Sequence, residues 1–223
     1  MASLFLETTY VKAEQVGVAI GKNTYLREVE ISNLGISNLY HGADLPPENA
    51  ALLESLCKSI ANNRSTENLK INHFDHSHVD IFPILAPFFK HNPNLRFLDV
   101  SFSKNFAERI PSFISALLQS NFSQLEGFNL WQNKIGDIQS ANLFNALTDM
   151  PGMQNLLELR LGFNGIGIEG CKSLGKLLKN PSSRIQCLNL CSNAIDDSCM
   201  EILVGALVVN NTILMLILEV KIT

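Results

Sequence analysis

The sequence predicts an α/β solenoid: one curved domain with a parallel sheet on one face and helices on the other. Three observations predict it. Leu and Asn are unusually frequent, with 33 Leu and 23 Asn among 223 residues. The pattern L-x-x-L-x-L-x-x-N-x-I occurs three times without gaps, at Leu125–Ile135, Leu156–Ile166 and Ile185–Ile195. Each copy is followed by an apolar pair, 10 and 14 residues after its Asn.

Each copy contains two apolar periodicities, of which the first predicts a strand and the second predicts a helix. The alternation L-x-L is typical of a strand with one buried face, whereas an apolar pair at i and i+4 lies on one side of a helix. The later copies start 28 to 31 residues apart. A strand and a helix of that combined length cannot bury their own apolar faces, so stacked neighbours bury them together. The Asn after each strand is expected to turn the chain and to hydrogen-bond loop backbone.

The same register continues in both directions, so we predict a single domain over residues 1–223 with about seven to eight repeats. The copies begin near residues 1, 26, 66, 95, 125, 156, 185 and 213. In chain order, the strand and helix positions are Leu4 and Leu6 with Val16 and Ile20; Val29 and Ile31 with Leu56 and Ile60; Leu69 and Ile71 with Ile84 and Phe88; Leu98 and Val100 with Phe113 and Leu117; Phe128 and Leu130 with Leu143 and Leu147; Leu159 and Leu161 with Leu174 and Leu178; Leu188 and Leu190 with Leu203 and Leu207; and finally Leu216 and Leu218. Thr9, Leu34, Phe74 and Ser103 replace the Asn in the first four copies, so we expect a different loop geometry there.

The copy that begins at residue 26 is the longest and carries an insertion at 36–49. Pro46 and Pro47 are expected to begin the helix that runs through Ile60, because proline is accepted in a first helical turn. The insertion has two interpretations. It is either a tolerated surface loop or a protrusion that contacts a partner through Leu39–His41.

Charge and targeting patterns argue against several classes of protein. The formal charge is -4, so the chain has no strong positive field for nucleic acid or acidic lipid. The first residues lack the basic and apolar regions of a secretory signal, and no run reaches the ~18 apolar residues of a membrane span. Five Cys do not form a dense disulfide framework. We therefore expect a cytoplasmic or nuclear protein that is not secreted and that binds neither nucleic acid nor membrane.

A glycine motif, G-x-G-x-x-G, spans Gly165–Gly170. In a dinucleotide-binding fold the first glycine follows the strand closely. Here Gly162–Asn164 intervenes, and the motif falls in the repeat register. We interpret it as a repeat loop.

The densest set of potential metal ligands comprises His73, Asp75, His76, His78 and Asp80. A metal site needs three or four converging ligands, and His76 falls at an inward repeat position, so we interpret these histidines as structural. The sequence contains no nucleophile elbow, zinc-protease motif or P-loop. We predict no catalytic residue, no cofactor and no bound metal.

The repeat pattern as a whole resembles the leucine-rich-repeat family. The spacing and the signs N-x-I-x-x-x-G at Asn164, Ile166 and Gly170 are similar to the ribonuclease-inhibitor-like subfamily, which also occurs in Ran GTPase-activating proteins and in the C-terminal repeats of NOD-like receptors. The resemblance covers the whole chain. It implies a horseshoe segment with the sheet on its concave face and the helices on its convex face.

Residues between the buried Leu positions point to the concave face, because side chains alternate along a strand. The partner-binding residues that we predict there are Phe97, Asp99, Asn129, Trp131, Glu158 and Arg160. Aromatic residues and Arg beside carboxylates are typical of binding hot spots. The mixed charge favours a protein partner over nucleic acid.

The last predicted strand, Ile213–Leu218, is almost wholly apolar, whereas a capping repeat has a polar outer face. An exposed apolar edge strand pairs readily with another chain. The chain is therefore either part of a longer array or a protein that self-associates through this edge.

The sequence favours a non-catalytic protein-protein interaction module that binds its partner on the concave face. The resemblance implies two alternatives: a small-GTPase regulator similar to Ran GTPase-activating protein, or a repeat fragment of a NOD-like sensor. No motif here can be matched residue by residue to the GTPase-regulating activity.

Overall fold

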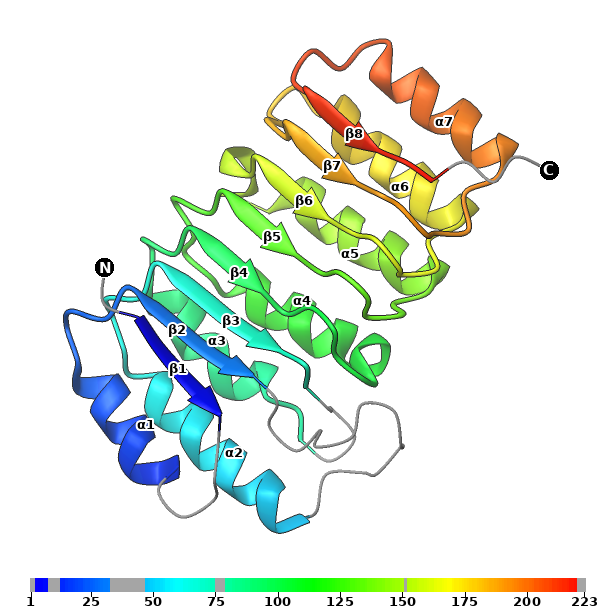
Figure 1. Ribbon diagram of the computed structural model, residues 1–223. Helices are drawn as coiled ribbons and strands as arrows, with labels where there is room; N and C mark the ends of the chain where they lie inside the picture. Colours follow the sequence, from blue (N-terminus) through cyan, green and yellow to red (C-terminus); the bar gives the residue numbers. More distant parts are fainter. Residues whose placement is uncertain (1–2, 8–12, 33–46, 75–78, 151, 220–223) are drawn as a thin grey trace.

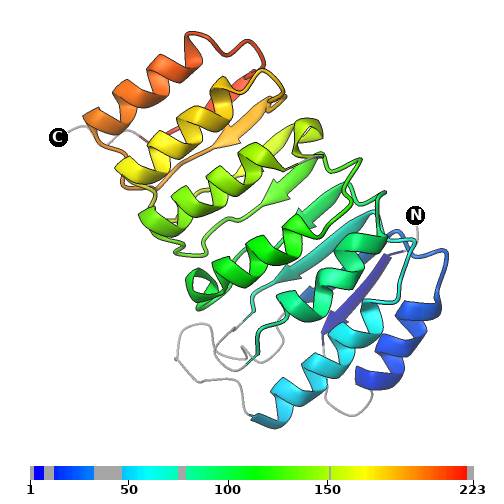
Figure 2. The same cartoon turned by 180° about the vertical axis from the view of Figure 1, so that it is seen from behind.

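Eight parallel strands form one sheet in chain order, and the helices that connect them cover one face of it (Figure 1). The computed structural model describes residues 3–7, 13–32, 47–74, 79–150 and 152–219. Viewed from behind, the helices lie side by side as a single layer (Figure 2). This architecture confirms the α/β solenoid that the two periodicities predict.

Strands and helices alternate along the described chain. They are β1 (Ser3–Glu7), α1 (Ala13–Lys22), β2 (Glu28–Ser32), α2 (Pro47–Ile60), β3 (Asn68–Asn72), α3 (Phe82–His91), β4 (Phe97–Asp99), η2 (Phe106–Arg109), α4 (Ile110–Leu118), β5 (Gly127–Asn129), α5 (Asp137–Asp149), η3 (Met153–Asn155), β6 (Glu158–Arg160), α6 (Ile168–Lys179), β7 (Cys187–Asn189), α7 (Asp197–Leu207) and β8 (Met215–Ile217). The elements η2 and η3 are short 3-10 helices. The helix α2 begins at the second of the two prolines, as predicted. Residues 36–46 of the insertion lie outside the described residues.

Equivalent repeat positions face one another across every strand pair. Leu98 lies beside Phe128, Phe128 beside Leu159, and Leu159 beside Leu188. All four side chains are buried. Because a slip of one residue would turn each of them to the opposite face, this shared register is what builds the core.

Phenylalanines fill the core of the middle copies. The rings of Phe82, Phe106, Phe113 and Phe128 contact one another, with centroid distances of 4.7 to 5.8 Å. Phe74, which replaces the repeat Asn, is also completely buried. An aromatic side chain thus occupies a position that later copies give to a hydrogen-bonding amide.

An asparagine ladder joins the turns that follow the later strands. Asn164 Nδ2 donates to the carbonyl oxygens of Leu130 at 2.7 Å and Leu161 at 3.0 Å. Its Oδ1 accepts from the backbone N–H of Asn133 at 3.0 Å. Asn193 makes the corresponding bonds one copy later. Each Asn therefore satisfies buried backbone in its own turn and in the preceding copy, as the repeat pattern predicts.

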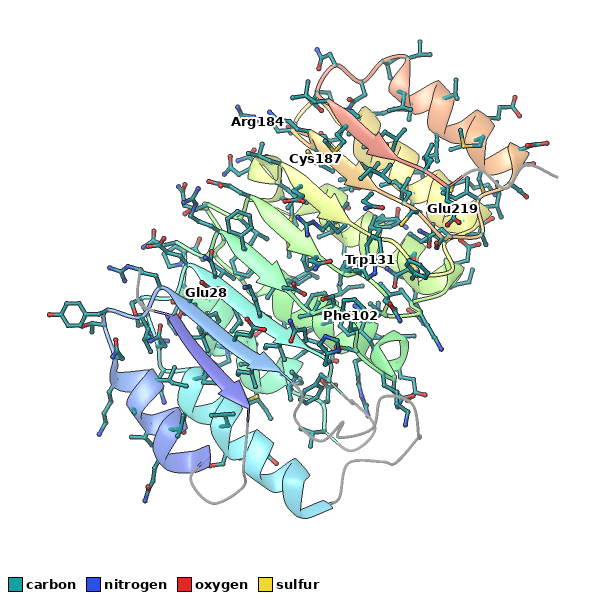
Figure 3. The ribbon with its side chains drawn as sticks, in the orientation of Figure 1. Glu28, Phe102, Trp131, Arg184, Cys187 and Glu219 are labelled. Atoms are coloured by element: carbon teal, nitrogen blue, oxygen red, sulfur yellow. The ribbon has the colours of Figure 1, made fainter. Side chains whose placement is uncertain are left out.

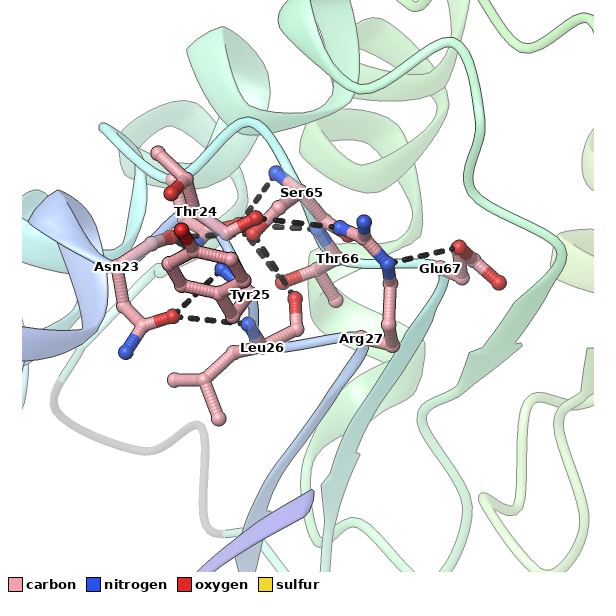
Figure 4. Close-up of polar contacts among 9 residues, drawn as sticks. Asn23, Thr24, Tyr25, Leu26, Arg27, Ser65, Thr66 and Glu67 are labelled. Atoms are coloured by element: carbon pink, nitrogen blue, oxygen red, sulfur yellow. Dashed lines mark hydrogen bonds and ion pairs between the residues drawn. The ribbon is translucent and has the colours of Figure 1, made fainter. Parts of the chain in front are cut away.

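A second asparagine ladder joins the turns that precede the strands, and the repeat pattern does not predict it. Asn63 Nδ2 donates to the carbonyl oxygens of Ile20 and Asn23, each at 2.8 Å. Asn92 Nδ2 then donates to the carbonyl oxygen of Asn63 at 2.8 Å. Figure 4 shows Asn23, whose Oδ1 accepts two backbone N–H bonds from the turn that leads into β2. The two ladders together give a structural role to several of the Asn residues of the chain.

Candidate functional site

The six residues predicted to bind a partner lie along the exposed face of the sheet, opposite the helices. Phe97 and Asp99 lie in β4, Asn129 in β5, Glu158 and Arg160 in β6, and Trp131 two residues after Asn129. Asp99 is in register with Asn129, and Asn129 with Arg160, so these three form a row across three strands. Figure 3 shows Trp131 among the side chains of this face. The exposed face of the sheet is called the concave face below.

Asp99 and Asn129 form a hydrogen-bonded pair across β4 and β5. Asn129 Nδ2 donates to Asp99 Oδ2 at 2.9 Å. Asp99 Oδ1 accepts from the backbone N–H of Ser101 at 2.9 Å and from the Ser101 hydroxyl at 2.5 Å. Asn129 Oδ1 accepts from the backbone N–H of Trp131 at 3.1 Å, and Asn189 makes the same kind of bond at the end of β7. These bonds hold the side chains of the row in place.

Two aromatic rings of this face each lie against a glycine of the next repeat. A β-carbon on Gly127 would lie 2.3 Å from Phe97 Cδ1, and one on Gly162 would lie 2.5 Å from Trp131 Cζ3. Trp131 also contacts Phe163, with a centroid distance of 5.3 Å. The glycines therefore provide the space that lets both aromatic side chains extend across the sheet.

In the third to seventh copies, the residue just before the repeat Asn position has left-handed backbone, whether or not that position is an Asn. These residues are His73, Phe102, Gln132, Phe163 and Ser192, with φ between 53° and 59°. Bulky side chains rarely adopt this conformation. The backbone N–H of Phe102 donates to the carbonyl oxygen of Trp131 at 2.8 Å, and that of Gln132 to Gly162 at 2.8 Å. Bonds between neighbouring copies thus maintain the turn that presents Phe102 and Phe163 beside Trp131.

Two hollows lie on the concave face of the described chain. The larger hollow has a volume of about 440 Å³ and the smaller hollow about 230 Å³. Asn129, Glu158 and Arg160 line both, and we call these three residues the ridge. Phe97 and Asp99 line only the smaller hollow, and Trp131 lines only the larger. The structure therefore divides the six predicted residues between two adjoining sites.

Apart from Asp99, the charged side chains around the smaller hollow are arranged as ion pairs. Arg160 Nε lies 2.6 Å from Glu158 Oε1. Lys70 Nζ lies 2.7 Å from Glu28 Oε1 and 3.5 Å from Glu30 Oε2. The hydrogen bond to Glu28 raises the pKa of Lys70, so this side chain carries its charge throughout the physiological range.

A second set of ion pairs lies just before the strands, at the edge of the concave face. Arg27 Nε lies 3.2 Å from Glu67 Oε1 (Figure 4), and Arg96 contacts Glu126 at 2.7 Å. These side chains are partly exposed, at 29% to 47%, so they contribute little to stability. Each of these two pairs joins one Arg and one Glu, so together they carry no net charge.

The repeat pattern assigns Met215 and Ile217 only to an edge strand, but both also line the larger hollow with Trp131. They are 54% and 41% exposed. Cys187, between them and Trp131 in strand order, lines the same hollow. The alternation of side chains along β8 was a sufficient signal that Met215 and Ile217 share a face with Cys187.

The glycine motif at Gly165–Gly170 forms the turn into α6, and a carboxylate already occupies the start of that helix. Asp137 Oδ1 accepts from the backbone N–H of Gly167 at 2.9 Å and of Gly170 at 2.6 Å. Its Oδ2 accepts from the backbone N–H of Glu169 at 3.1 Å. A dinucleotide phosphate would need these same donors. The geometry supports the interpretation as a repeat loop.

Only some of the candidate metal ligands belong to the part of the chain that the structure describes. Residues 75–78, which include His76 and His78, lie outside the described residues. In the described remainder of the chain, no three His, Cys, Asp or Glu side chains gather where they could hold a metal ion. Among the helices described, none has the length and apolar character to cross a membrane.

Comparisons with known proteins agree on one type of repeat. A family model described as Leucine Rich repeat matches residues 152–175. The human NACHT, LRR and PYD domains-containing protein 14 is 30% identical over 123 residues, which cover 53% of this chain and 10% of that protein. The chain thus spans about a tenth of the length of this curated relative.

Two solved structures are similar at low identity. One is the tropomodulin C-terminal domain of Caenorhabditis elegans, with 13% identity, 88% of this chain and 92% of that chain covered, and a TM-score of 0.43. The other is an internalin of Listeria monocytogenes, with 16% identity, 92% and 71% covered, and a TM-score of 0.39.

Proposed function

We propose that this leucine-rich-repeat protein is a non-catalytic interaction module that binds a segment of another protein on its concave face. The observation that carries the proposal is the placement of Trp131. Its ring lies against Gly162 and Phe163 and lines the larger hollow. A large aromatic side chain that is already held in place can bury much apolar area with little loss of conformational freedom.

The ridge supplies the polar contacts that would orient the partner. Arg160 uses Nε for its ion pair with Glu158, and its side chain is 52% exposed. The remaining guanidinium N–H groups form a planar fork that suits carboxylate or carbonyl oxygens of a partner. An exposed ion pair contributes little to the stability of the fold. A partner can therefore bond to Arg160 with little loss of stability even if the pair with Glu158 weakens.

The carboxylates of this face act as acceptors within the protein. Asp99 accepts hydrogen bonds from Ser101 and Asn129, and Glu158 is paired with Arg160. We therefore assign these residues to positioning and binding, and place no chemical step on the concave face. All five cysteines are free thiols, which favours the cytoplasm as the compartment.

The proposal is tested by comparing the partners that tagged variants recover from cells. We expect Trp131→Ala to weaken binding by about 2 kcal/mol or more, as removal of a hot-spot side chain does. Arg160→Glu should also reduce recovery, because it replaces the cation of the ridge with a second carboxylate. The control is Ile138→Ala, on the opposite layer, where the side chain is 61% exposed. If both concave variants fold normally by circular dichroism and recover the same partners at the same level, the concave face is not the binding site.

A second candidate is that the chain is the repeat portion of a larger sensor. The 30% identity to the human NACHT, LRR and PYD domains-containing protein supports it. An antibody raised against the segment around Trp131 tests it on the endogenous protein. A band well above the mass of this chain supports the larger protein, and a single band at the mass of this chain excludes it.

A further inference from the structure

The two hollows differ in the number of charged side chains that line them, and this difference restricts the chemistry of the partner. Four carboxylates lie on or beside the smaller hollow and the ridge: Glu28, Glu30, Asp99 and Glu158. Two cations, Lys70 and Arg160, face them. Among the described side chains the area therefore has a surplus of two negative charges, which the evenly paired charges at the edge of the face do not offset.

Asp99 is the acceptor best placed for a cation from a partner. Its carboxylate accepts hydrogen bonds only from neutral groups, Ser101 and Asn129, among the described residues. Lys70, its register neighbour on β3, is engaged with Glu28 and Glu30. A basic side chain entering the smaller hollow would meet the Asp99 carboxylate beside the ring of Phe97, over which Arg96 already lies at 5.9 Å from the centroid.

The larger hollow has fewer charged side chains, since Glu158 and Arg160 of the ridge are the charged residues that line it in the described chain. Beyond the ridge it is lined by Trp131, Cys187, Met215 and Ile217. Its volume of about 440 Å³ is sufficient for one large apolar side chain. Partly exposed Met215 and Ile217 would lose apolar surface to water when such a side chain enters, and this burial favours binding.

The distance between the hollows sets the spacing of the two side chains. Asp99 lies in β4 and Cys187 in β7, so three strand spacings of ~4.8 Å separate them by about 14 Å. An extended peptide advances ~3.3 Å per residue, so the two side chains lie about four residues apart and on the same side. Arg160 of the ridge and Asn189 of the larger hollow favour an extended chain over a helix, because they can bond backbone groups that a helix has already satisfied.

We propose that the concave face binds an extended segment that carries a basic residue for the smaller hollow and a large apolar residue about four positions away for the larger hollow. The inference rests on the proposed function and specifies its partner. It predicts that the basic residue is selected by Asp99 and the apolar residue by Trp131, independently of each other.

The test uses a displayed library of random linear nine-residue peptides, selected on the purified full chain. We expect the enriched pool to combine Lys or Arg with a large apolar residue three to five positions apart. The pooled peptides are then measured against variants. Trp131→Ala should reduce affinity about tenfold or more, which is typical for loss of a hot-spot aromatic. Asp99→Asn should reduce it several-fold and remove the preference for a basic residue.

Asp99→Asn is expected to fold, because Asn129 and Asn189 already occupy equivalent positions and accept the same backbone bond. Asp149→Asn, an exposed site on α5, is the matched control and should leave affinity unchanged. Bound peptide should also slow alkylation of Cys187, which lines the larger hollow, whereas Cys57, Cys171 and Cys199 are buried throughout.

The outcomes separate this inference from the proposed function. Peptides that need Trp131 and Arg160 but show no basic preference, or no response to Asp99→Asn, overturn the inference and leave the concave-face function standing. Peptides that bind equally to Trp131→Ala and Arg160→Glu overturn both. Failure to enrich any linear peptide contradicts the extended segment, and the partner-recovery experiment then decides the function alone.

Discussion

Trp131 lies against Gly162 of the next repeat, so closely that a β-carbon there would be 2.5 Å from the indole Cζ3. Gly162 has no positive φ, so its backbone does not require glycine. Phe97 and Gly127 repeat the arrangement one strand pair earlier. Gly162 therefore leaves the space that the Trp131 ring occupies, and the position of that ring on the concave face depends on this glycine.

We expect Gly162→Ala to displace the Trp131 ring, because the added methyl group overlaps it. Overpacking of this kind costs about 1–3 kcal/mol where the neighbours cannot move, and less where a surface ring can rotate away. Trp131 is the only Trp, so its fluorescence spectrum reports the movement directly. Partner binding should weaken in parallel.

The control for this substitution is Gly205→Ala in α7. A β-carbon added to that glycine would have no atom within 4 Å, and alanine favours a helix, so stability should rise by about 0.5–1 kcal/mol. An unchanged Trp131 spectrum in Gly162→Ala would show that the ring is not held by that glycine.

The asparagine ladder predicts a graded series of stability losses. Asn164 is fully buried and bonds backbone groups in two copies. Asn164→Ala leaves several buried groups unpaired and should cost about 3–5 kcal/mol, at 1–3 kcal/mol for each such group. Asn193 is only partly buried, so Asn193→Ala should cost less. Asn142→Ala, on the exposed side of α5, should stay within about 0.5 kcal/mol of the original chain in urea unfolding. Equal losses at Asn164 and Asn142 would contradict the ladder.

The left-handed turns predict a substitution that stabilises the fold. Gln132 is exposed and has φ of 55°. This conformation costs a side-chain-bearing residue about 1–2 kcal/mol, part of which glycine avoids despite its greater entropy when unfolded. Gln132→Gly should therefore raise stability by roughly 0.5–1 kcal/mol. Lys176→Gly, at an exposed helical site in α6, should lower it by about 1 kcal/mol. A destabilised Gln132→Gly variant would mean that its side chain, rather than its backbone, is needed.

The strand register could be predicted from the sequence because both of its determinants are local. Alternate Leu positions define the buried face, and in the three copies that keep it the Asn marks where the strand ends. The second ladder has an equally local signal, since Asn23, Asn63, Asn92 and Asn210 each precede the start of a copy by three residues. That ladder was therefore predictable as well, although the L-x-L pattern alone does not include it.

The composition of the two hollows could not be predicted in the same way. Trp131 lines the same hollow as Met215 and Ile217, three strand spacings away, and this depends on how the copies stack and twist. Asp137 likewise reaches the start of α6 one copy later. No spacing within a single copy encodes such contacts, because each joins residues about 30 or more positions apart.

The copies from residue 125 to 207 should form the most stable part of the array. They keep the Asn ladder and the buried Leu set, and stability in a solenoid spreads between neighbouring repeats. Leu159→Ala or Leu188→Ala should cost about 2–5 kcal/mol by leaving a core cavity. Hydrogen exchange should be slowest in β5, β6 and β7. Slower hydrogen exchange before residue 80 than after residue 125 would contradict this prediction.

The last prediction concerns self-association at the C-terminal edge of the sheet. In the described chain β8 pairs only with β7, and Val208, Val209 and Leu214 beside it are 79%, 64% and 78% exposed. An open apolar edge offers both unpaired backbone groups and apolar surface to a second chain. We expect sedimentation equilibrium to show dimers that form as concentration rises.

Leu214→Lys should shift that equilibrium to monomer, because a pairing of this edge would have to desolvate the added charge. Leu214 does not line the larger hollow, so peptide binding on the concave face should be unaffected. Ile138→Lys, at another exposed apolar site on α5, controls for a general gain in solubility and should leave the dimer intact. A chain that stays monomeric at every concentration would exclude the edge as a self-association surface. A dimer that survives Leu214→Lys but not Ile138→Lys would move the interface to the helical layer.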